Sequence, residues 1–277
     1  MTATNTCPEL LPGDREALDR LRERIAELGS AVIAYSGGVD STLLLAVATE
    51  VLGERVAAVT AVSPTLPPHE LTFAMEQARR LEVRHELIES HELDLPAFTA
   101  NPKDRCYHCK AHRFAALRKW ASAEGYHHLL DGTNLDDLGD DRPGMKAAEE
   151  QGALRPLLDA GFDKARVRRV SSCLGLPGSD RPPEACYATR FPTGAAITPD
   201  RLRQISEAES GLHALGFEVA RVRWHGEMAR VEMPAADLAR VVEPEVRSRA
   251  VAAVKAAGFR LVTLDLTPYR AGGANPG

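Results

Sequence analysis

The hydrophobic residues in the first half of the chain follow two alternating patterns. Short apolar runs lie at 31–35 and 56–62, the second rich in Val and Ala, and strand-like segments lie at 84–88 and 128–132. Segments in which apolar residues recur every three or four positions lie at 14–28, 42–53, 68–81 and 106–124. The short runs predict buried strands and the longer segments predict helices, the first of them capped by Asp14. Strands alternating with helices predict an α/β fold, with helices covering both faces of a parallel sheet.

The pattern changes after Thr198. A helix is predicted at 199–215, two strands at 219–224 and 229–233, a second helix ending near 257, and a last strand at 260–265. This order is typical of a small α+β domain. We therefore expect two domains, residues 1–195 and 196–277, with an irregular Gly- and Pro-rich loop at 175–183 before the boundary.

The segment Ser36-Gly37-Gly38-Val39-Asp40-Ser41 joins the first predicted strand to its helix. A helix N-terminus presents unpaired N–H groups and the positive end of the helix dipole, so it binds phosphate. The two glycines let the backbone approach a ligand closely, and the serines add hydroxyl donors. The segment lacks the Gly-Lys-Ser/Thr ending of a Walker A loop. It predicts a phosphate site of another kind, with an ordinary strand-to-helix turn as the alternative.

A second motif, Asp131-Gly132-Thr133-Asn134-Leu135-Asp136-Asp137, follows the fourth predicted strand. The carboxyl ends of parallel strands meet at one edge of a sheet, where ligands bind. Carboxylates beside a phosphate site are suited to Mg²⁺, which prefers oxygen ligands, and Asp40 is the predicted Mg²⁺ ligand of the first motif. The alternative is a turn stabilised by an aspartate side chain.

The composition limits the classes of function. A net charge of −5 and a pI near 6.0 argue against tight nucleic-acid binding. The sequence has no apolar run of about 18 residues, which argues against a membrane span, and its start lacks the pattern of a secretory signal. Five cysteines, an odd number, do not favour a disulfide framework. We expect a cytoplasmic protein.

Three of the cysteines lie in segments that favour chemistry. Cys106 and Cys109 form a Cys-x-x-Cys pair, which suits a metal, a cluster or a redox pair. The alternative is two small residues on one helical face. Cys186 follows the Pro-rich loop, and Arg190 is placed to lower the pKa of its thiol. Cys7 and Cys173 have no predicted chemical role.

Taken together, the motifs resemble a known family. The segment at 36–41 has the Ser-Gly-Gly-x-Asp-Ser form of the PP-loop ATP pyrophosphatases, a superfamily with a HUP-like parallel sheet that cleaves ATP between its α- and β-phosphates. Further motifs resemble LarE, the ATP-dependent sulfur transferase family of nickel-pincer nucleotide synthesis. They are Arg-Cys-Tyr-x-Cys-Lys at 105–110, Arg142-Pro143-Gly144, Cys186-x-Ala188-x-Arg190 and Leu264-Asp265-Leu266-x-x-Tyr269-Arg270. The likeness spans nearly the whole chain.

The resemblance implies a substrate and a reaction. The substrate is a pyridinium dicarboxylate mononucleotide. With ATP and Mg²⁺ its carboxylate is adenylated, and sulfur then replaces AMP to give a thiocarboxylate. The family also implies a homo-oligomer, for which a hexamer would fit, that works on a small molecule without a membrane or nucleic acid. The chain departs from the commoner family pattern at Tyr187-Ala188-Thr189 and at Thr193.

Further site residues are expected in the second domain. Arg221 and Arg223 alternate on a predicted strand, so they face one side and are suited to clamp a phosphate. Arg190 is another candidate for substrate binding. Glu209 and Glu232 are candidate metal ligands, with a plain surface role as the alternative.

The family has two sources of sulfur. In one type, the cysteine at the position of Cys186 gives up its own sulfur and becomes dehydroalanine. In the other, three cysteines hold a [4Fe–4S] cluster. Because Cys106 and Cys109 accompany Cys186, we favour the cluster type.

Two other functions stay open at this point. One is a PP-loop tRNA thiolase with a three-cysteine cluster, against which the acidic net charge and the tail domain argue. The other is a non-catalytic nucleotide-binding protein with a structural zinc. That protein would bind ATP without releasing pyrophosphate.

Overall fold

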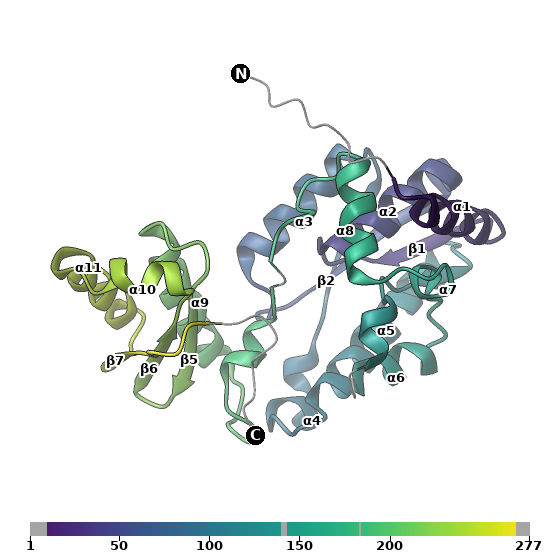
Figure 1. The fold of residues 1–277 in the computed structure, drawn as a ribbon. Helices are drawn as coiled ribbons and strands as arrows, with labels where there is room; N and C mark the ends of the chain where they lie inside the picture. The colour runs from purple at the N-terminus through teal and green to yellow at the C-terminus, as the bar shows by residue number, and fades with distance from the viewer. Residues whose placement is uncertain (1–9, 140–142, 183, 270–277) are drawn as a thin grey trace. The chain divides into compact units, whose positions relative to one another are not determined.

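A computed structural model describes residues 10–139, 143–182 and 184–269 of the 277-residue chain. The chain divides into two compact units (Figure 1). Unit 1 takes in the described chain up to Ser63, Pro68–Glu92 and Cys106–Glu184; unit 2 takes in Pro64–Pro67, Leu93–Arg105 and the described chain from Ala185 onward. Within the described ranges, no helix has the length and apolar character needed to cross a membrane.

Unit 1 is built on a four-stranded parallel sheet, as its alternating pattern predicts. The strands are β1 (Ala31–Ala34), β2 (Val56–Val62), β3 (Arg84–Glu89) and β4 (His128–Leu130). Their order across the sheet is β3-β2-β1-β4, and every pairing is parallel. The ends of β1 and β4, which carry the two polar motifs, are therefore neighbours. The predicted α/β class is confirmed.

Helices cover both faces of this sheet. The main ones are α1 (Pro12–Ala26), α2 (Val39–Leu52), α3 (Pro68–Arg80), α5 (Arg105–Ala123) and α8 (Lys164–Cys173). Shorter ones are α6 (Pro143–Glu150), α7 (Pro156–Asp159) and the 3₁₀ turns η1 (Gly53–Arg55), η2 (Glu92–Asp94) and η3 (Leu135–Gly139). Successive residues of β1 point to opposite faces. Ile33 packs in a core with residues of α1, α2 and α8, whereas Val32 packs in a second core with Phe114 and Leu117 of α5.

Asp14 does not cap the first helix, contrary to the sequence prediction. Helix α1 begins at Pro12, and its N-cap residue makes no side-chain cap. Asp14 instead lies buried in the first turn and accepts hydrogen bonds from Arg166 and Arg169 of α8. The hydrogen bond from Arg169 is the main cause that lowers the pKa of Asp14. An ion pair across the helix layer has replaced a local cap.

Unit 2 contains a three-stranded sheet. Strands β5 (Arg221–His225) and β6 (Met228–Glu232) form an antiparallel hairpin that turns at Gly226, whose φ is +68°. Strand β7 (Leu261–Leu264) joins β6 in parallel, after α10 (Ala235–Val241) and α11 (Pro244–Ala256). Helix α9 (Pro199–Ala214) precedes the sheet. These elements form the small α+β fold that the sequence predicts.

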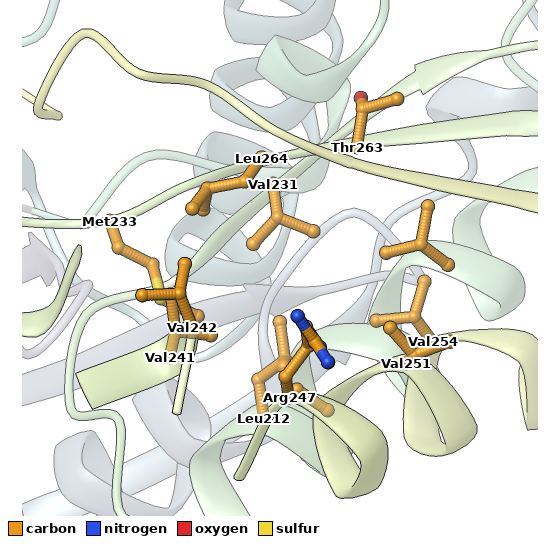
Figure 2. A pocket seen from close by; sticks show the side chains of 12 residues that line it. Leu212, Val231, Met233, Val241, Val242, Arg247, Val251, Val254, Thr263 and Leu264 are labelled. Atoms are coloured by element: carbon orange, nitrogen blue, oxygen red, sulfur yellow. The ribbon is translucent and has the colours of Figure 1, made fainter. Parts of the chain in front are cut away.

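An apolar cavity of about 160 Å³ lies inside unit 2 (Figure 2). Aliphatic side chains from β6, β7 and the three helices line it, among them Leu212, Val231 and Val254. Arg247 and Thr263 are the polar residues of this lining. A lining with so few polar groups indicates a packing region of the domain rather than a site of chemistry.

Unit 2 is assembled from three stretches of chain. The Tyr187 N–H donates to the Thr65 carbonyl at 2.8 Å, and the Ile197 N–H donates to the Thr99 carbonyl at 2.8 Å. Asn101, on the loop after α4 (Pro96–Thr99), has a φ of +55° and uses its side-chain amide to donate to the Pro192 carbonyl at 2.8 Å. Asparagine tolerates this left-handed conformation better than most residues. The main stretch of the second unit therefore starts at Ala185, and two segments from the first half of the chain join it, whereas the sequence pattern predicted a single break at 195/196.

Candidate functional site

The Ser-Gly-Gly-Val-Asp-Ser segment forms a tight turn between β1 and α2. Gly37 has a φ of +76°, and a Cβ atom there would lie 2.8 Å from the Cβ of Ala74 on α3, so only glycine fits. The hydroxyls of Ser36 and Ser41 lie 3.2 Å apart, and the Gly38 N–H donates to Ser36 Oγ at 3.3 Å. The serines thus brace the turn that opens α2.

The second motif meets this turn directly. Asn134 Nδ2 donates to Asp40 Oδ1 at 3.0 Å. A Cβ atom on Gly132 would lie 3.0 Å from the backbone nitrogen of Ser41, so the end of β4 packs tightly on the start of α2. Thr133 is buried and donates to Asp131 Oδ2 at 2.8 Å. The structure brings the two sequence motifs together at one edge of the sheet.

Two lysines that the sequence analysis did not single out lie at this edge. Lys164 Nζ donates to Asp40 Oδ2, and Lys110 Nζ donates to Asp131 Oδ2 at 2.8 Å. Lys110 is the last residue of the Arg-Cys-Tyr-His-Cys-Lys motif, so the motif itself could have marked it as a candidate site residue. Lys164 follows Asp163, the N-cap of α8, and no local pattern marks it. Both ammonium groups add positive charge beside a helix N-terminus suited to phosphate.

Carboxylates at the same edge provide the oxygen ligands that Mg²⁺ prefers. Asp136 Oδ2 accepts from the Lys164 backbone N–H at 2.9 Å, and Asp137 Oδ2 accepts from the Asn134 N–H at 3.0 Å. Asp40 lies at the same edge, so the residues predicted to hold Mg²⁺ offer oxygen ligands there. In this structure Asp40 is shared between Asn134 and Lys164.

Cys106 and Cys109 lie one turn apart on α5. Residues three apart on a helix share a face, so the two thiols point to the same side. Cys106 is exposed and Cys109 is half-buried. A pair of accessible thiols on one helix face fits a thiolate-bound metal centre. Cys186 belongs to unit 2.

Cys186 is a half-buried free thiol that immediately precedes η4 (Tyr187–Arg190). Its carbonyl accepts from the backbone N–H and the hydroxyl of Thr189, at 3.0 and 2.9 Å. Thr189, one of the positions at which the chain departs from the commoner family pattern, therefore caps the turn that follows Cys186.

Arg190 and Glu209 bind each other inside unit 2. Arg190 Nε and Nη2 donate to the two carboxylate oxygens of Glu209 at 2.8 and 3.0 Å, and their side chains are 1% and 0% exposed. Glu209 Oε1 also accepts from the Val222 N–H at 2.8 Å, and Arg190 Nη1 donates to the Ala185 carbonyl. This geometry supports a structural role for both residues, while the substrate role of Arg190 and the metal role of Glu209 stay predictions.

Arg221 and Arg223 occupy one face of the β5–β6 hairpin. They are 2% and 7% exposed, so they are not solvated surface residues. Arg223 donates to the Thr189 carbonyl at 2.8 Å and to Glu232 at 2.7 Å, and Arg230 donates to the other oxygen of Glu232 at 2.9 Å. Arg230 also pairs with Asp265 at 3.6 Å, so with Arg221 this face carries three arginines and two carboxylates, an excess of positive charge that suits an anionic ligand.

The positive charge of this face acts on His225. Burial lowers the pKa of His225, and the charges of Arg230 and Arg223 lower it further. Glu232, predicted as a metal ligand, is engaged by Arg223 and Arg230. Cys7, Arg142 and Arg270, which belong to the sequence motifs or the cysteine count, lie outside the described residues.

Comparison with known proteins adds to this geometry. No protein-family model matches the chain. The chain is 35% identical to the pyridinium-3,5-bisthiocarboxylic acid mononucleotide synthase of Lactiplantibacillus plantarum, over 91% of each chain. This chain belongs to the LarE family. The protein slr1717 of Synechocystis is 43% identical over 93% of this chain and 96% of its own.

The LarE resemblance seen in the sequence is thus confirmed, and so is its PP-loop character. One subunit of the glutamine-hydrolysing GMP synthase of Methanosphaerula palustris is 27% identical over 59% of this chain and 56% of its own length. This likeness agrees with the parallel sheet and with the turn between β1 and α2. The chain is an enzyme of the PP-loop class.

Proposed function

We propose that this protein is an ATP-dependent sulfur transferase that converts the carboxylates of a pyridinium dicarboxylate mononucleotide to thiocarboxylates. The observation that carries the proposal is the contact between Asn134 and Asp40, which joins the two nucleotide motifs at one sheet edge. The name of the Lactiplantibacillus plantarum relative supports the choice of product.

The first step activates a carboxylate. Its oxygen attacks the α-phosphorus of ATP, the bond to the bridging oxygen breaks, and pyrophosphate leaves. The helix α2 N-terminus, with Ser36 and Ser41, binds the phosphates, and Lys110 and Lys164 offset their charge. Asp40, Asp136 and Asp137 would hold Mg²⁺, which neutralises the leaving pyrophosphate. Positioning and charge stabilisation are the main contributions of the protein to such a step.

The second step transfers sulfur. In the sacrificial route, the Cys186 thiolate attacks the acyl carbon and AMP leaves with the electron pair of the broken C–O bond, which gives a thioester. Removal of the Cys186 α-proton then breaks the Cβ–S bond, leaving the thiocarboxylate on the substrate and dehydroalanine in the chain. The arginines of β5 are suited to bind the anionic substrate.

The alternative sulfur source is a cluster held by Cys106, Cys109 and Cys186. A bound [4Fe–4S] cluster with three protein thiolates would supply an iron on which external sulfide is carried. We favour this route because the two cysteines of α5 accompany Cys186, and a sacrificial enzyme needs Cys186 alone. We further propose a homo-oligomer in the cytoplasm that acts on a small nucleotide and on no nucleic acid.

The activation step is tested by its products. With ATP, Mg²⁺ and the dicarboxylate nucleotide, the protein should release pyrophosphate and AMP. Gly132→Ala places a methyl group against Ser41 and should lower the rate of pyrophosphate release about tenfold to a hundredfold, since small displacements in a site have effects of that size. Gly13→Ala is the matched control, because a Cβ there meets its neighbour at an ordinary 3.8 Å. Formation of ADP would contradict the proposed chemistry.

The sulfur source is tested by mass spectrometry of the peptide that contains Cys186. On the cluster route its mass is unchanged after many turnovers with sulfide, and Cys106→Ser abolishes sulfur transfer. On the sacrificial route Cys186 loses the mass of H₂S after one turnover, and Cys106→Ser stays active. A dehydroalanine at 186 would therefore reject the cluster and leave sulfur transfer standing. Unchanged activity of Cys186→Ser would reject both routes.

A further inference from the structure

Three potential metal ligands that belong to neither nucleotide motif gather in unit 1. His69 and Glu70 lie in the first turn of α3, and Glu184 is the last residue of unit 1. One ligand atom from each lies within 4.8 Å of the other two. Glu70 is buried, and His69 and Glu184 are half-buried. Burial of part of the cluster distinguishes it from an ordinary acidic surface.

We propose that His69, Glu70 and Glu184 bind one divalent transition-metal ion. An imidazole nitrogen with two carboxylate oxygens is a ligand set that suits ions such as Zn²⁺, and three protein ligands leave a position for water. Ligand atoms of a tetrahedral ion with bonds of about 2.1 Å are about 3.4 Å apart. Since two of the ligand side chains are partly exposed, small rotations bring them to that spacing.

Arg181 supports this assignment through Glu70. Its Nη2 donates to Glu70 Oε1 at 2.5 Å, and its guanidinium stacks 4.2 Å from the centroid of the Phe73 ring. Carboxylates that bind metals usually accept a further hydrogen bond, which fixes their orientation. Each carboxylate oxygen has two acceptor sites, so Glu70 can accept from Arg181 and bind an ion. Arg181 is thus a positioning residue for Glu70.

The ion would link two segments of the molecule that matter for the reaction. On one side is α3, which carries His69 and Glu70 in its first turn and whose Ala74, further along the helix, packs against Gly37 of the phosphate turn. On the other is Glu184, two residues before Cys186 in the chain. Arg190 binds both Glu209 and the Ala185 carbonyl, so it holds the chain directly after Glu184. The metal would hold Glu184 itself and so fix the chain that leads to Cys186, whichever sulfur source the enzyme uses.

The proposal is tested by equilibrium dialysis of Zn²⁺ against the full chain without ATP. Cys106, Cys109 and Cys186 are first changed to serine, so that their thiolates bind no zinc. One zinc site should remain, and His69→Ala or Glu184→Ala should weaken it more than about a hundredfold, beyond the effect of losing an outer hydrogen-bond partner. His91→Ala is the matched control, because the exposed His91 pairs with the exposed Glu89.

Amide hydrogen exchange gives a second readout that does not depend on activity. Zinc should slow exchange at residues 69–72 and 184–186 in the parent protein and in His91→Ala, and it should leave His69→Ala unchanged. A zinc affinity that is the same in His69→Ala, Glu184→Ala and the parent would place the ion elsewhere and overturn the proposal. Absence of any zinc site in the serine-substituted parent would overturn it as well.

Discussion

Glu92 lies with no exposed surface beside the carboxyl ends of β2 and β3. The hydroxyls of Ser63 and Ser90 each donate to it at 2.5 Å, and Arg113 donates at 2.7 Å. Burial raises the pKa of Glu92, but the charge of Arg113 and the hydrogen bonds outweigh it and lower the pKa to about 2. Glu92 therefore stabilises the folded protein while it is ionised.

The stability that Glu92 contributes should disappear in acid. Its folded pKa is depressed, so the contribution is complete above the unfolded value near 4.5 and is lost as the pH falls through about 2. Glu92→Gln should lower the free energy of unfolding by about 3 kcal/mol at pH 7, and by about half of that near pH 3. Urea unfolding between pH 7 and pH 3 measures this.

Glu89→Gln is the control for that series, because the Glu89 side chain is 87% exposed. It should change the free energy of unfolding little at any pH. A deficit in Glu92→Gln that stays constant from pH 7 to pH 3 would mean that ionisation of Glu92 is not what stabilises the fold.

At the scale of single residues, the sequence showed which segments belong to the site better than it showed which side chains contact one another. Ser36, Gly37 and Asn134 lie together because local motifs on adjacent strand ends were readable. Arg190 and Glu209 could not be recognised as an ion pair, since a buried guanidinium and a substrate-binding one look alike in sequence. Lys164 was missed for a similar reason: its contact with Asp40 spans 124 residues.

At the scale of elements, the pair between η4 and α9 makes a strong prediction. Glu209→Gln leaves the buried charge of Arg190 without its counter-ion and should destabilise the fold by about 3–5 kcal/mol. The double change Arg190→Met with Glu209→Leu should be less destabilised than either single change, because apolar side chains replace buried ion pairs well. Urea unfolding at pH 7 measures all three.

Helix α9 offers its own control. Arg203 and Glu207 form an exposed pair with side chains 67% and 55% exposed, so Glu207→Gln should cost less than about 1 kcal/mol. If Glu209→Gln were as mild as Glu207→Gln, the buried pair would not hold η4 in place.

The strands and helices were largely predictable because each is an apolar run or an amphipathic segment bounded by polar residues. The sheet order β3-β2-β1-β4 could not be predicted, since no local sequence pattern indicates which strands pair. The cap assigned to Asp14 was wrong for the same physical reason. Arg166 and Arg169, more than 150 residues away, provide better partners than the first turn of its own helix.

At the scale of the whole molecule, unit 2 depends on chain far from its main body. A fragment of residues 185–277 retains β5, β6, β7 and helices α9 to α11 but lacks Pro64–Pro67 and Leu93–Arg105. It loses the hydrogen bonds to Thr65, Thr99 and Asn101, so it should not unfold cooperatively. Circular dichroism and the dispersion of amide NMR signals measure this against the full chain.

Adding residues 93–105 as a separate peptide should restore part of the dispersion, whereas a peptide of the same composition in scrambled order should not. A fragment that melts as cooperatively as the full chain would show that unit 2 is independent of these loops. A single domain break read from the sequence could not reveal this dependence, because loop segments carry no periodic pattern that assigns them to a domain.

The hydrogen bond from Asn101 to the Pro192 carbonyl also imposes an order of events during synthesis on the ribosome. Pro192 lies 91 residues further along the chain than Asn101. At translation rates of about 5–20 residues per second, Asn101 emerges about 5 to 18 seconds before the carbonyl it binds. During that interval the segment at 93–105 has left the ribosome, but the later residues that it contacts in the folded protein have not yet emerged. The nascent chain is therefore most open to chaperones and proteases at this segment until Pro192, about two-thirds of the way along the chain, has emerged.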